Sequence, residues 1–144
     1  MYKLEHIGIA VKSLDKSDGL FQRLIGVPSY KHETIADQLV TTSFFRTGDV
    51  KLELLEATSS DSPIHKFIEK RGEGIHHIAF EVEDILAAMQ RLASEGFQLL
   101  QDEPSRGADN KWVCFLHPHS CNGVLVEICQ SMDQEGNQMN VLEH

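Results

Sequence analysis

The sequence predicts an α+β fold of two βαβββ modules, and the main evidence is an internal repeat. Residues 5–11 read Glu-His-Ile-Gly-Ile-Ala-Val and residues 76–82 read His-His-Ile-Ala-Phe-Glu-Val, which aligns His6 with His77. Large apolar residues recur at alternate positions in both segments, the period of a strand with one buried face. A helical pattern and then three strand-like segments follow each of them. Because neither half alone would bury much core, we expect one domain over residues 1–130.

Composition supports a folded protein and excludes several classes. The 144 residues are 41% apolar and carry a formal charge of −9, which is typical of a globular chain and argues against general nucleic-acid binding. No apolar run approaches the roughly 20 residues of a membrane span, and the first residues do not resemble a signal peptide. The three cysteines form no Cys-x-x-Cys motif, so we expect reduced thiols. These features predict a soluble, cytoplasmic protein.

The first module is expected to span residues 4–58. Its helix begins at Ser13 or Asp15 and ends at Gly26. The apolar face of this helix is expected to consist of Leu20, Phe21 and Leu24. Three strands should follow, at residues 28–33, 40–46 and 50–56. The pair Gly48-Asp49 predicts a hairpin turn between the last two strands.

A linker helix is expected within residues 61–72, because Ser62 can cap its start, Pro63 suits its first turn and Gly72 can end it. The second module should then cover residues 74–130. Its helix has an apolar stripe between a capping Asp84 and a terminating Gly96, made of Ile85, Ala88, Met89 and Leu92. Strands should follow at residues 97–102, 112–116 and 124–129, with a turn at Asn122-Gly123. Residues 131–144 form a polar tail whose final Leu-Glu-His resembles a purification-tag scar.

Each module begins with a strand histidine and ends with a strand glutamate. The pairs are His6 with Glu53 and His77 with Glu127, and both glutamates lie in strongly apolar segments. Burying a lone carboxylate costs several kcal/mol unless another charge compensates it. Taken singly, a strand histidine is more often a surface or hydrogen-bonded residue than a ligand. The repetition of the pair instead favours a divalent metal site, and mixed nitrogen and oxygen ligands suit Zn, Mn, Co, Ni or Fe(II) better than calcium.

These features resemble the vicinal oxygen chelate superfamily of glyoxalases, extradiol dioxygenases and bleomycin-resistance proteins, over residues 4–130. Within it, the chain most resembles the methylmalonyl-CoA epimerase family. The segments that carry the resemblance are His6-Ile-Gly-Ile-Ala-Val, Asp49-Val-Lys-Leu-Glu-Leu-Leu-Glu, Asp61-Ser-Pro-Ile, Gly74-Ile-His-His-Ile-Ala-Phe-Glu-Val, Gly107-Ala-Asp-Asn-Lys, Phe115-Leu-His-Pro and Gly123-Val-Leu-Val-Glu.

The resemblance implies a glyoxalase-like, metal-centred cleft and an epimerase that interconverts (2R)- and (2S)-methylmalonyl-CoA by removing and returning the C2 proton through a metal-stabilised enolate. The implied metal is Co²⁺, with Zn²⁺, Mn²⁺ or Ni²⁺ possible, held by His6, Glu53, His77 and Glu127. Glu127 is the first candidate for a catalytic base. Some relatives place a second glutamate where this chain has Thr42, so Glu53 or a metal-bound water would have to supply the second base.

The sequence gives weaker signals for the residues that contact the substrate and for the oligomeric state than for the metal ligands. A CoA thioester needs positive charge near its phosphates, and Arg106 and Lys111 in a glycine-containing loop are candidates, although solvated loop charges explain them equally well. Relatives form homodimers, so the resemblance also implies a homodimer.

Two other functions remain open from the sequence. A glyoxalase-type lactoylglutathione lyase could use the same four ligands, and a non-catalytic small-molecule binding protein could use the same cleft. An extradiol dioxygenase fits less well, because a fourth protein ligand would crowd the oxygen-binding positions of its iron.

Overall fold

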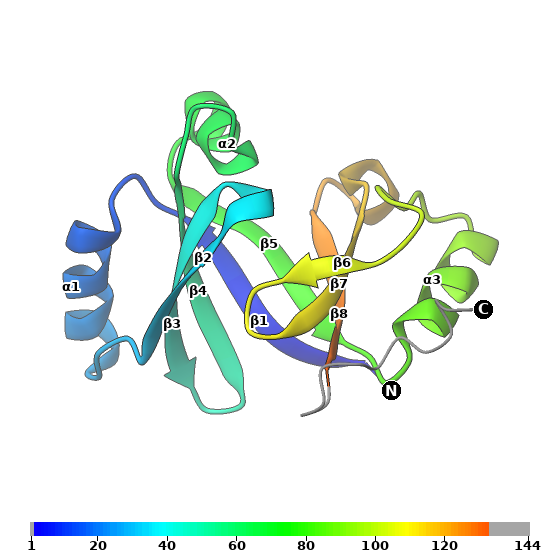
Figure 1. Ribbon diagram of the computed structural model, residues 1–144, viewed down its shortest axis with the longest axis horizontal. Coiled ribbons are helices and arrows are strands. Elements are labelled where there is room, and N and C mark those ends of the chain that lie inside the picture. Colours follow the sequence, from blue (N-terminus) through cyan, green and yellow to red (C-terminus); the bar gives the residue numbers. More distant parts are fainter. Residues whose placement is uncertain (1, 133–144) are drawn as a thin grey trace.

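The computed structural model describes residues 2–132, which form one mixed sheet of eight strands with three α-helices (Figure 1). In sheet order, the strands are β2 (Lys31–Ile35), β3 (Val40–Thr47), β4 (Val50–Ala57), β1 (Lys3–Ala10), β5 (Gly74–Glu81), β8 (Val126–Ser131), β7 (Lys111–Leu116) and β6 (Ser105–Gly107). The first four strands of the chain therefore form one half of the sheet and the last four form the other. This arrangement confirms the α+β fold of two βαβββ modules.

The helices pack against the two halves in equivalent ways. Helix α1 (Leu14–Ile25) contacts β3 and β4, and α3 (Ile85–Ser94) contacts β7 and β8, at opposite ends of the molecule (Figure 1). Helix α2 (Pro63–Arg71) links the modules and contacts β4 and β5. Two short 3₁₀ turns, η1 (Ala36–Gln38) and η2 (Pro118–Cys121), lie in the connections that follow β2 and β7.

The helix boundaries agree with the capping residues in the sequence. Ser13, Ser62 and Asp84 occupy the N-cap positions, and each side chain accepts a hydrogen bond from a backbone N–H in the first turn. Gly26 ends α1 in the left-handed region at φ 92°, where a residue without a Cβ is favoured. The hairpin turn at Gly48-Asp49 is also confirmed, since β3 ends at Thr47 and β4 begins at Val50.

The expected apolar face of α1 is confirmed at Phe21 but wrong at Leu20 and Leu24. Leu20 and Leu24 are 52% and 72% exposed, while Leu14 is buried and Phe21 and Ile25 pack against the same core cluster. The residues that face the sheet are therefore Leu14, Phe21 and Ile25, at intervals of seven and four residues. The two exposed leucines lie on the solvent side of this helix.

The strand expected at residues 97–102 is also wrong. This segment makes only an isolated bridge, between Leu99 and Leu116, beside β7. The side-chain amide of Gln101 takes over part of the pairing, because its Oε1 accepts from Phe115 N at 3.3 Å and its Nε2 donates to the Val113 carbonyl at 3.2 Å. The short strand β6 follows instead and completes the edge of the sheet.

The register of the four middle strands brings equivalent residues of the two modules together. Strands β1 and β5 are antiparallel, while β4 runs parallel to β1 and β8 runs parallel to β5. Gly8 lies opposite Glu53 on one side and His77 on the other, and Ala79 lies opposite Glu127 and His6. Each histidine is therefore level with the glutamate of the other module, and only a small residue separates the two in the sheet.

None of the helices within the described residues is long and apolar enough to span a membrane. Residues 133–144, which include the expected tag scar, lie outside the part of the chain that the structure describes.

Replacing Gly8 by alanine should destabilise the fold. A Cβ at this position would come within 2.2 Å of the His77 ring, so the ring or strand β1 would have to shift. We expect Gly8→Ala to lower the free energy of unfolding by about 1–3 kcal/mol, measured by urea denaturation. Gly19→Ala is the matched control: its new Cβ would lie 3.7 Å from Arg23 inside helix α1, so this change should be neutral or stabilising. Equal stabilities for the two variants would contradict the close packing at Gly8.

Candidate metal centre and active-site cavity

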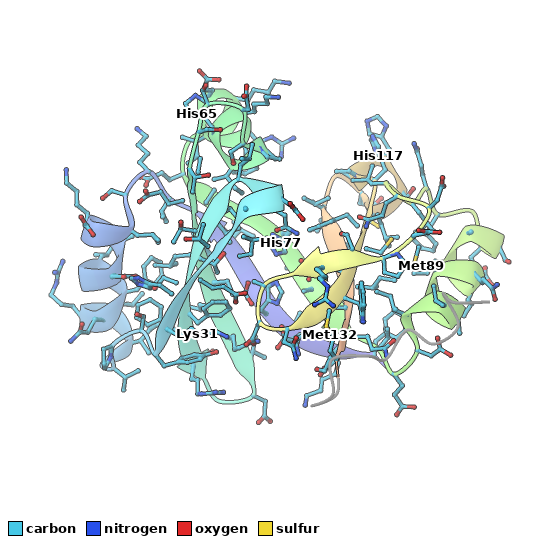
Figure 2. The ribbon with its side chains drawn as sticks, in the orientation of Figure 1. Lys31, His65, His77, Met89, His117 and Met132 are labelled. Carbon is cyan, nitrogen blue, oxygen red and sulfur yellow. The ribbon has the colours of Figure 1, made fainter. Side chains whose placement is uncertain are left out.

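The four residues expected to bind a metal lie on the four middle strands. His6 is on β1, Glu53 on β4, His77 on β5 and Glu127 on β8, and none is more than 5% exposed. The Nε2 atoms of His6 and His77 are 3.0 Å apart, and Glu127 Oε1 lies 3.3 Å from His77 Nε2 and 3.7 Å from His6 Nε2. Both modules thus contribute donor atoms to one point, and His77 lies near the middle of the molecule (Figure 2).

Glu53 lies on the other side of the His6 ring. Its Oε2 is 3.1 Å from His6 Nδ1, whereas His77 and Glu127 face His6 Nε2. The donor atoms of His6, His77 and Glu127 all lie within 4.8 Å of one another, and those of Glu5, His6 and Glu53 form a second such group. A buried set of two imidazoles and a carboxylate, with a further carboxylate adjacent, fits a divalent transition metal by its donor chemistry.

Glu5 was missed in the sequence, although it is one of the buried residues of this group. In a regular strand the neighbours Glu5 and His6 would point to opposite faces. A register shift between Leu4 and His6 in the β1–β5 pairing places both side chains in the interior, 8% and 4% exposed. Glu5 Oε1 then lies 2.6 Å from His6 Nδ1. Such a carboxylate orients a histidine so that its Nε2 faces the metal position.

Lys51 supplies the buried positive charge beside these carboxylates. It lies opposite His6 in the β1–β4 register, is 7% exposed, and places its Nζ 2.7 Å from Glu5 Oε2. It also donates to Asp109, in the β6–β7 turn, and Asp109 accepts from Lys31 on β2 at 2.7 Å. The ion pairs of Asp109 with Lys31 and Lys51 therefore connect the β6–β7 hairpin of the second module to the first module. Lys51 in turn pairs with Glu5, which contacts the His6 ring.

Burial and the surrounding charges shift the pKa values of this group in opposite directions. Burial raises the pKa of Glu53 to about 7, with His6 opposing the rise and Glu127 adding to it. Burial would also raise the pKa of Glu127, but hydrogen bonds from His6 and His77 outweigh it and lower the pKa. The same carboxylates raise the pKa of His6 to about 10, although burial acts against this. A cluster that favours a proton on His6 so strongly would also attract a cation, which must displace that proton to bind.

His76 supports the second histidine. Its Nδ1 lies 3.0 Å from His77 Nδ1, so one ring nitrogen donates to the other, and its ring packs edge-on against Phe67 of α2. Burial, together with the neighbouring His77, lowers the pKa of His76 to about 4. A neutral His76 therefore holds His77 by its Nδ1, which leaves Nε2 directed at Glu127.

The donor atoms lie in the wall of a cavity of about 550 Å³. Turn η1, strands β3 and β4, the start of α2 and strand β7 all contribute to its lining, and apolar side chains such as Leu55, Ile64 and Phe115 are part of it. Two further carboxylates also line it, Asp37 from η1 and Asp61 from the segment before α2. A cavity of this size and lining suits a small molecule with a few polar groups.

The two residues expected to bind substrate do not line this cavity. Lys111 is 9% exposed and donates to Ser131 at 2.7 Å and to Glu81 at 3.4 Å. The Arg106 guanidinium lies 5.1 Å from the centre of the Trp112 ring, in a separate hollow beside β2. Thr42 does line the cavity and is buried, at 1% exposed.

Comparisons with known proteins agree with this geometry. Residues 5–115 match the model of the Glyoxalase/Bleomycin resistance protein/Dioxygenase superfamily. An ethylmalonyl-CoA/methylmalonyl-CoA epimerase of Cereibacter sphaeroides is 42% identical over 130 residues, covering 89% of this chain and 97% of the relative. The uncharacterized protein YqjC of Bacillus subtilis (strain 168) is 40% identical over 138 residues, covering 96% and 99%.

A solved structure extends the similarity to the fold. A variant of the Streptomyces coelicolor methylmalonyl-CoA epimerase, in complex with 2-nitronate-propionyl-CoA, superposes with a TM-score of 0.86 at 36% identity, covering 90% of this chain and 96% of that one. The chain therefore belongs to the glyoxalase/bleomycin resistance protein/dioxygenase superfamily and, within it, to the methylmalonyl-CoA epimerase family.

Proposed function

We propose that this chain is a metal-dependent epimerase that interconverts (2R)- and (2S)-methylmalonyl-CoA by removing and returning the proton at C2. One observation supports the proposal: the buried imidazoles of both modules, His6 and His77, and the carboxylate of Glu127 come together in the wall of a 550 Å³ cavity, in a chain of the epimerase family. For the donor set we propose the expected His6, Glu53, His77 and Glu127, of which Glu53 lies beside His6 Nδ1 and outside the group formed by the other three. The metal that we propose is Co²⁺.

The reaction requires little more than charge stabilisation and two well-placed bases. The C2 hydrogen is acidic because it lies between a thioester and a carboxylate, and its removal leaves an enolate. Lewis-acid stabilisation of that negative charge is the chemistry that a bound divalent cation supplies. Apolar side chains of the cavity wall, such as Leu55 and Phe115, would orient the substrate beside the donors.

Two carboxylates are placed on opposite sides of the centre. In sheet order, β4 carries Glu53 on one side of β1 and β5, and β8 carries Glu127 on the other. An epimerase needs a base on each face of a planar intermediate, and the position of the two glutamates on different sides of β1 and β5 supports this assignment. Glu127 is our first base and Glu53 our second. Asp37 is an alternative second base, because it lines the same cavity from η1, whereas Thr42 has no carboxylate to offer.

We also make a proposal for the cellular location, the oligomeric state and the substrate class of the enzyme. We propose that the protein acts in the cytoplasm as a homodimer on a CoA thioester.

Removal of metal should abolish activity without unfolding the protein. We expect the metal-replete protein to exchange the C2 proton of methylmalonyl-CoA for deuterium in D₂O, and a chelator to suppress this exchange by at least about 100-fold, since electrostatic stabilisation of the developing charge is lost. The measurement is the NMR signal at C2, with re-addition of Co²⁺ as the control for recovery. Absence of exchange in the metal-replete protein would overturn the epimerase proposal, and turnover of a glutathione hemithioacetal by the same sample would favour the lyase.

Amide substitutions should separate the bases from the residues that only line the cavity. Glu127→Gln should lower kcat by about 10²–10⁴-fold, because an amide cannot accept the proton. Glu53→Gln and Asp37→Asn decide the second base: the one that matters should lose exchange of only one C2 epimer, measured with each epimer in turn. Thr42→Val serves as the cavity control and should retain the exchange of both. If Glu53→Gln retains metal and full turnover, the assignment of Glu53 is wrong.

A further inference from the structure

Two carboxylates compete for one nitrogen of the His6 ring. Glu5 Oε1 lies 2.6 Å from His6 Nδ1, and Glu53 Oε2 lies 3.1 Å from the same nitrogen. A neutral imidazole whose Nε2 binds a metal carries its only hydrogen on Nδ1, so it donates a well-aligned hydrogen bond to one carboxylate at a time. The carboxylate that does not accept this hydrogen bond remains free to bind elsewhere.

Lys51 distinguishes between these two carboxylates. Its Nζ lies 2.7 Å from Glu5 Oε2 but 4.0 Å from Glu53 Oε2. Lys51 precedes Glu53 by two positions on β4, so the two side chains point to the same face of the sheet, and both are buried. A hydrogen bond between two charged groups is stronger than one between neutral groups. Glu5 is therefore held through both of its oxygens, by Lys51 and by His6, whereas Glu53 lies beyond hydrogen-bond distance of the ammonium.

Contacts from outside the centre hold the Lys51 ammonium beside Glu5. Lys51 donates to Asp109, which also accepts from Lys31 at 2.7 Å. The backbone N–H of Asp109 donates to Glu33 Oε1 at 2.8 Å, so the turn that carries Asp109 is itself attached to β2. All of these contacts come from residues outside the proposed ligand set. They keep the ammonium in place independently of His6, which allows it to act on the centre through Glu5.

We propose that Lys51 is a positioning residue for the metal centre, because it holds Glu5 against His6 Nδ1 and thereby leaves Glu53 available as a ligand. This inference rests on the proposed function, since it requires a divalent metal with Glu53 in its ligand set. It gives separate roles to the two carboxylates that form a group with His6: Glu5 orients the ring, and Glu53 binds the metal. Without the ion pair, Glu53 becomes the carboxylate that accepts from Nδ1.

A set of variants measures whether Glu53 binds the metal only when this ion pair is intact. Glu53→Ala is made in four backgrounds, which are the wild type, Lys51→Met, Glu5→Gln and Lys31→Met. The last is the matched control, because it removes the other lysine that pairs with Asp109. The dissociation constant for Co²⁺ is measured by competition with a chelator, and the visible absorption of the bound Co²⁺ reports its ligand geometry.

The effect of Glu53→Ala should depend on the background. In the wild type and in Lys31→Met it should raise the dissociation constant at least about tenfold and change the absorption, because alanine offers no ligand atom. In Lys51→Met and in Glu5→Gln it should change the constant by less than about twofold, because Glu53 has already left the metal for His6 Nδ1. Since each ratio is taken within one background, the direct repulsion between Lys51 and the cation cancels.

The outcomes separate this role from the proposed reaction, because the measurement needs no substrate. An equal effect of Glu53→Ala in all four backgrounds would overturn the positioning role and leave the ligand set intact. No effect in the wild type would mean that Glu53 is not a ligand, which overturns both. If Lys51→Met does not fold, Glu5→Gln decides alone, because it breaks the same ion pair from the other end. The expected metal result without any epimerase turnover would support the role of Lys51 and contradict the proposed substrate.

Discussion

The buried charge between the two modules is the constraint on which the rest of this structure depends. Glu5, Glu53 and Glu127 lie in the interior of a largely apolar sheet, where an uncompensated carboxylate costs several kcal/mol. Lys51 and the histidine rings provide the compensation, and they do so only while β4, β1, β5 and β8 keep their register. The charge cluster therefore favours this strand pairing over other registers. The strand pairing in turn orients the donor atoms toward one another.

Duplication explains why this cluster can exist in so small a chain. Each module supplies one strand histidine and one strand carboxylate, and the antiparallel contact of β1 with β5 places the two sets side by side. The small residues Gly8 and Ala79 leave the space that the imidazole of the other module occupies. Neither module has this arrangement alone. The site is therefore a property of the interface between the modules, and the ion pairs of Asp109 reinforce that interface at the edge of the sheet.

The sequence was sufficient for most features that depend on local pattern, although the pattern of α1 misplaced Leu20 and Leu24 on the buried face. The repeated histidine and glutamate predicted the centre, and the capping residues predicted the helices, because both signals are carried by a few adjacent positions. Two further failures involve contacts between segments that are distant in the sequence. Gln101 replaces a backbone ladder by its side chain, and Glu5 reaches the interior through a register shift that breaks the two-residue period. The residues of these two segments do not indicate which strand each segment lies beside or in which register.

The helix between the modules also bears on how an anionic substrate reaches the centre. Helix α2 joins the two modules, and Pro63 and Ile64 at its start are part of the cavity lining. This helix carries the exposed cations Lys66, Lys70 and Arg71 beside the cavity, whereas the buried carboxylates are paired internally and contribute little potential there. At physiological salt, charges act over about 8 Å, so the potential beside α2 depends on the nearby charges more than on the net charge of −9. An acidic chain can therefore accept an anionic substrate, because the helix that joins its modules carries exposed cations beside the cavity.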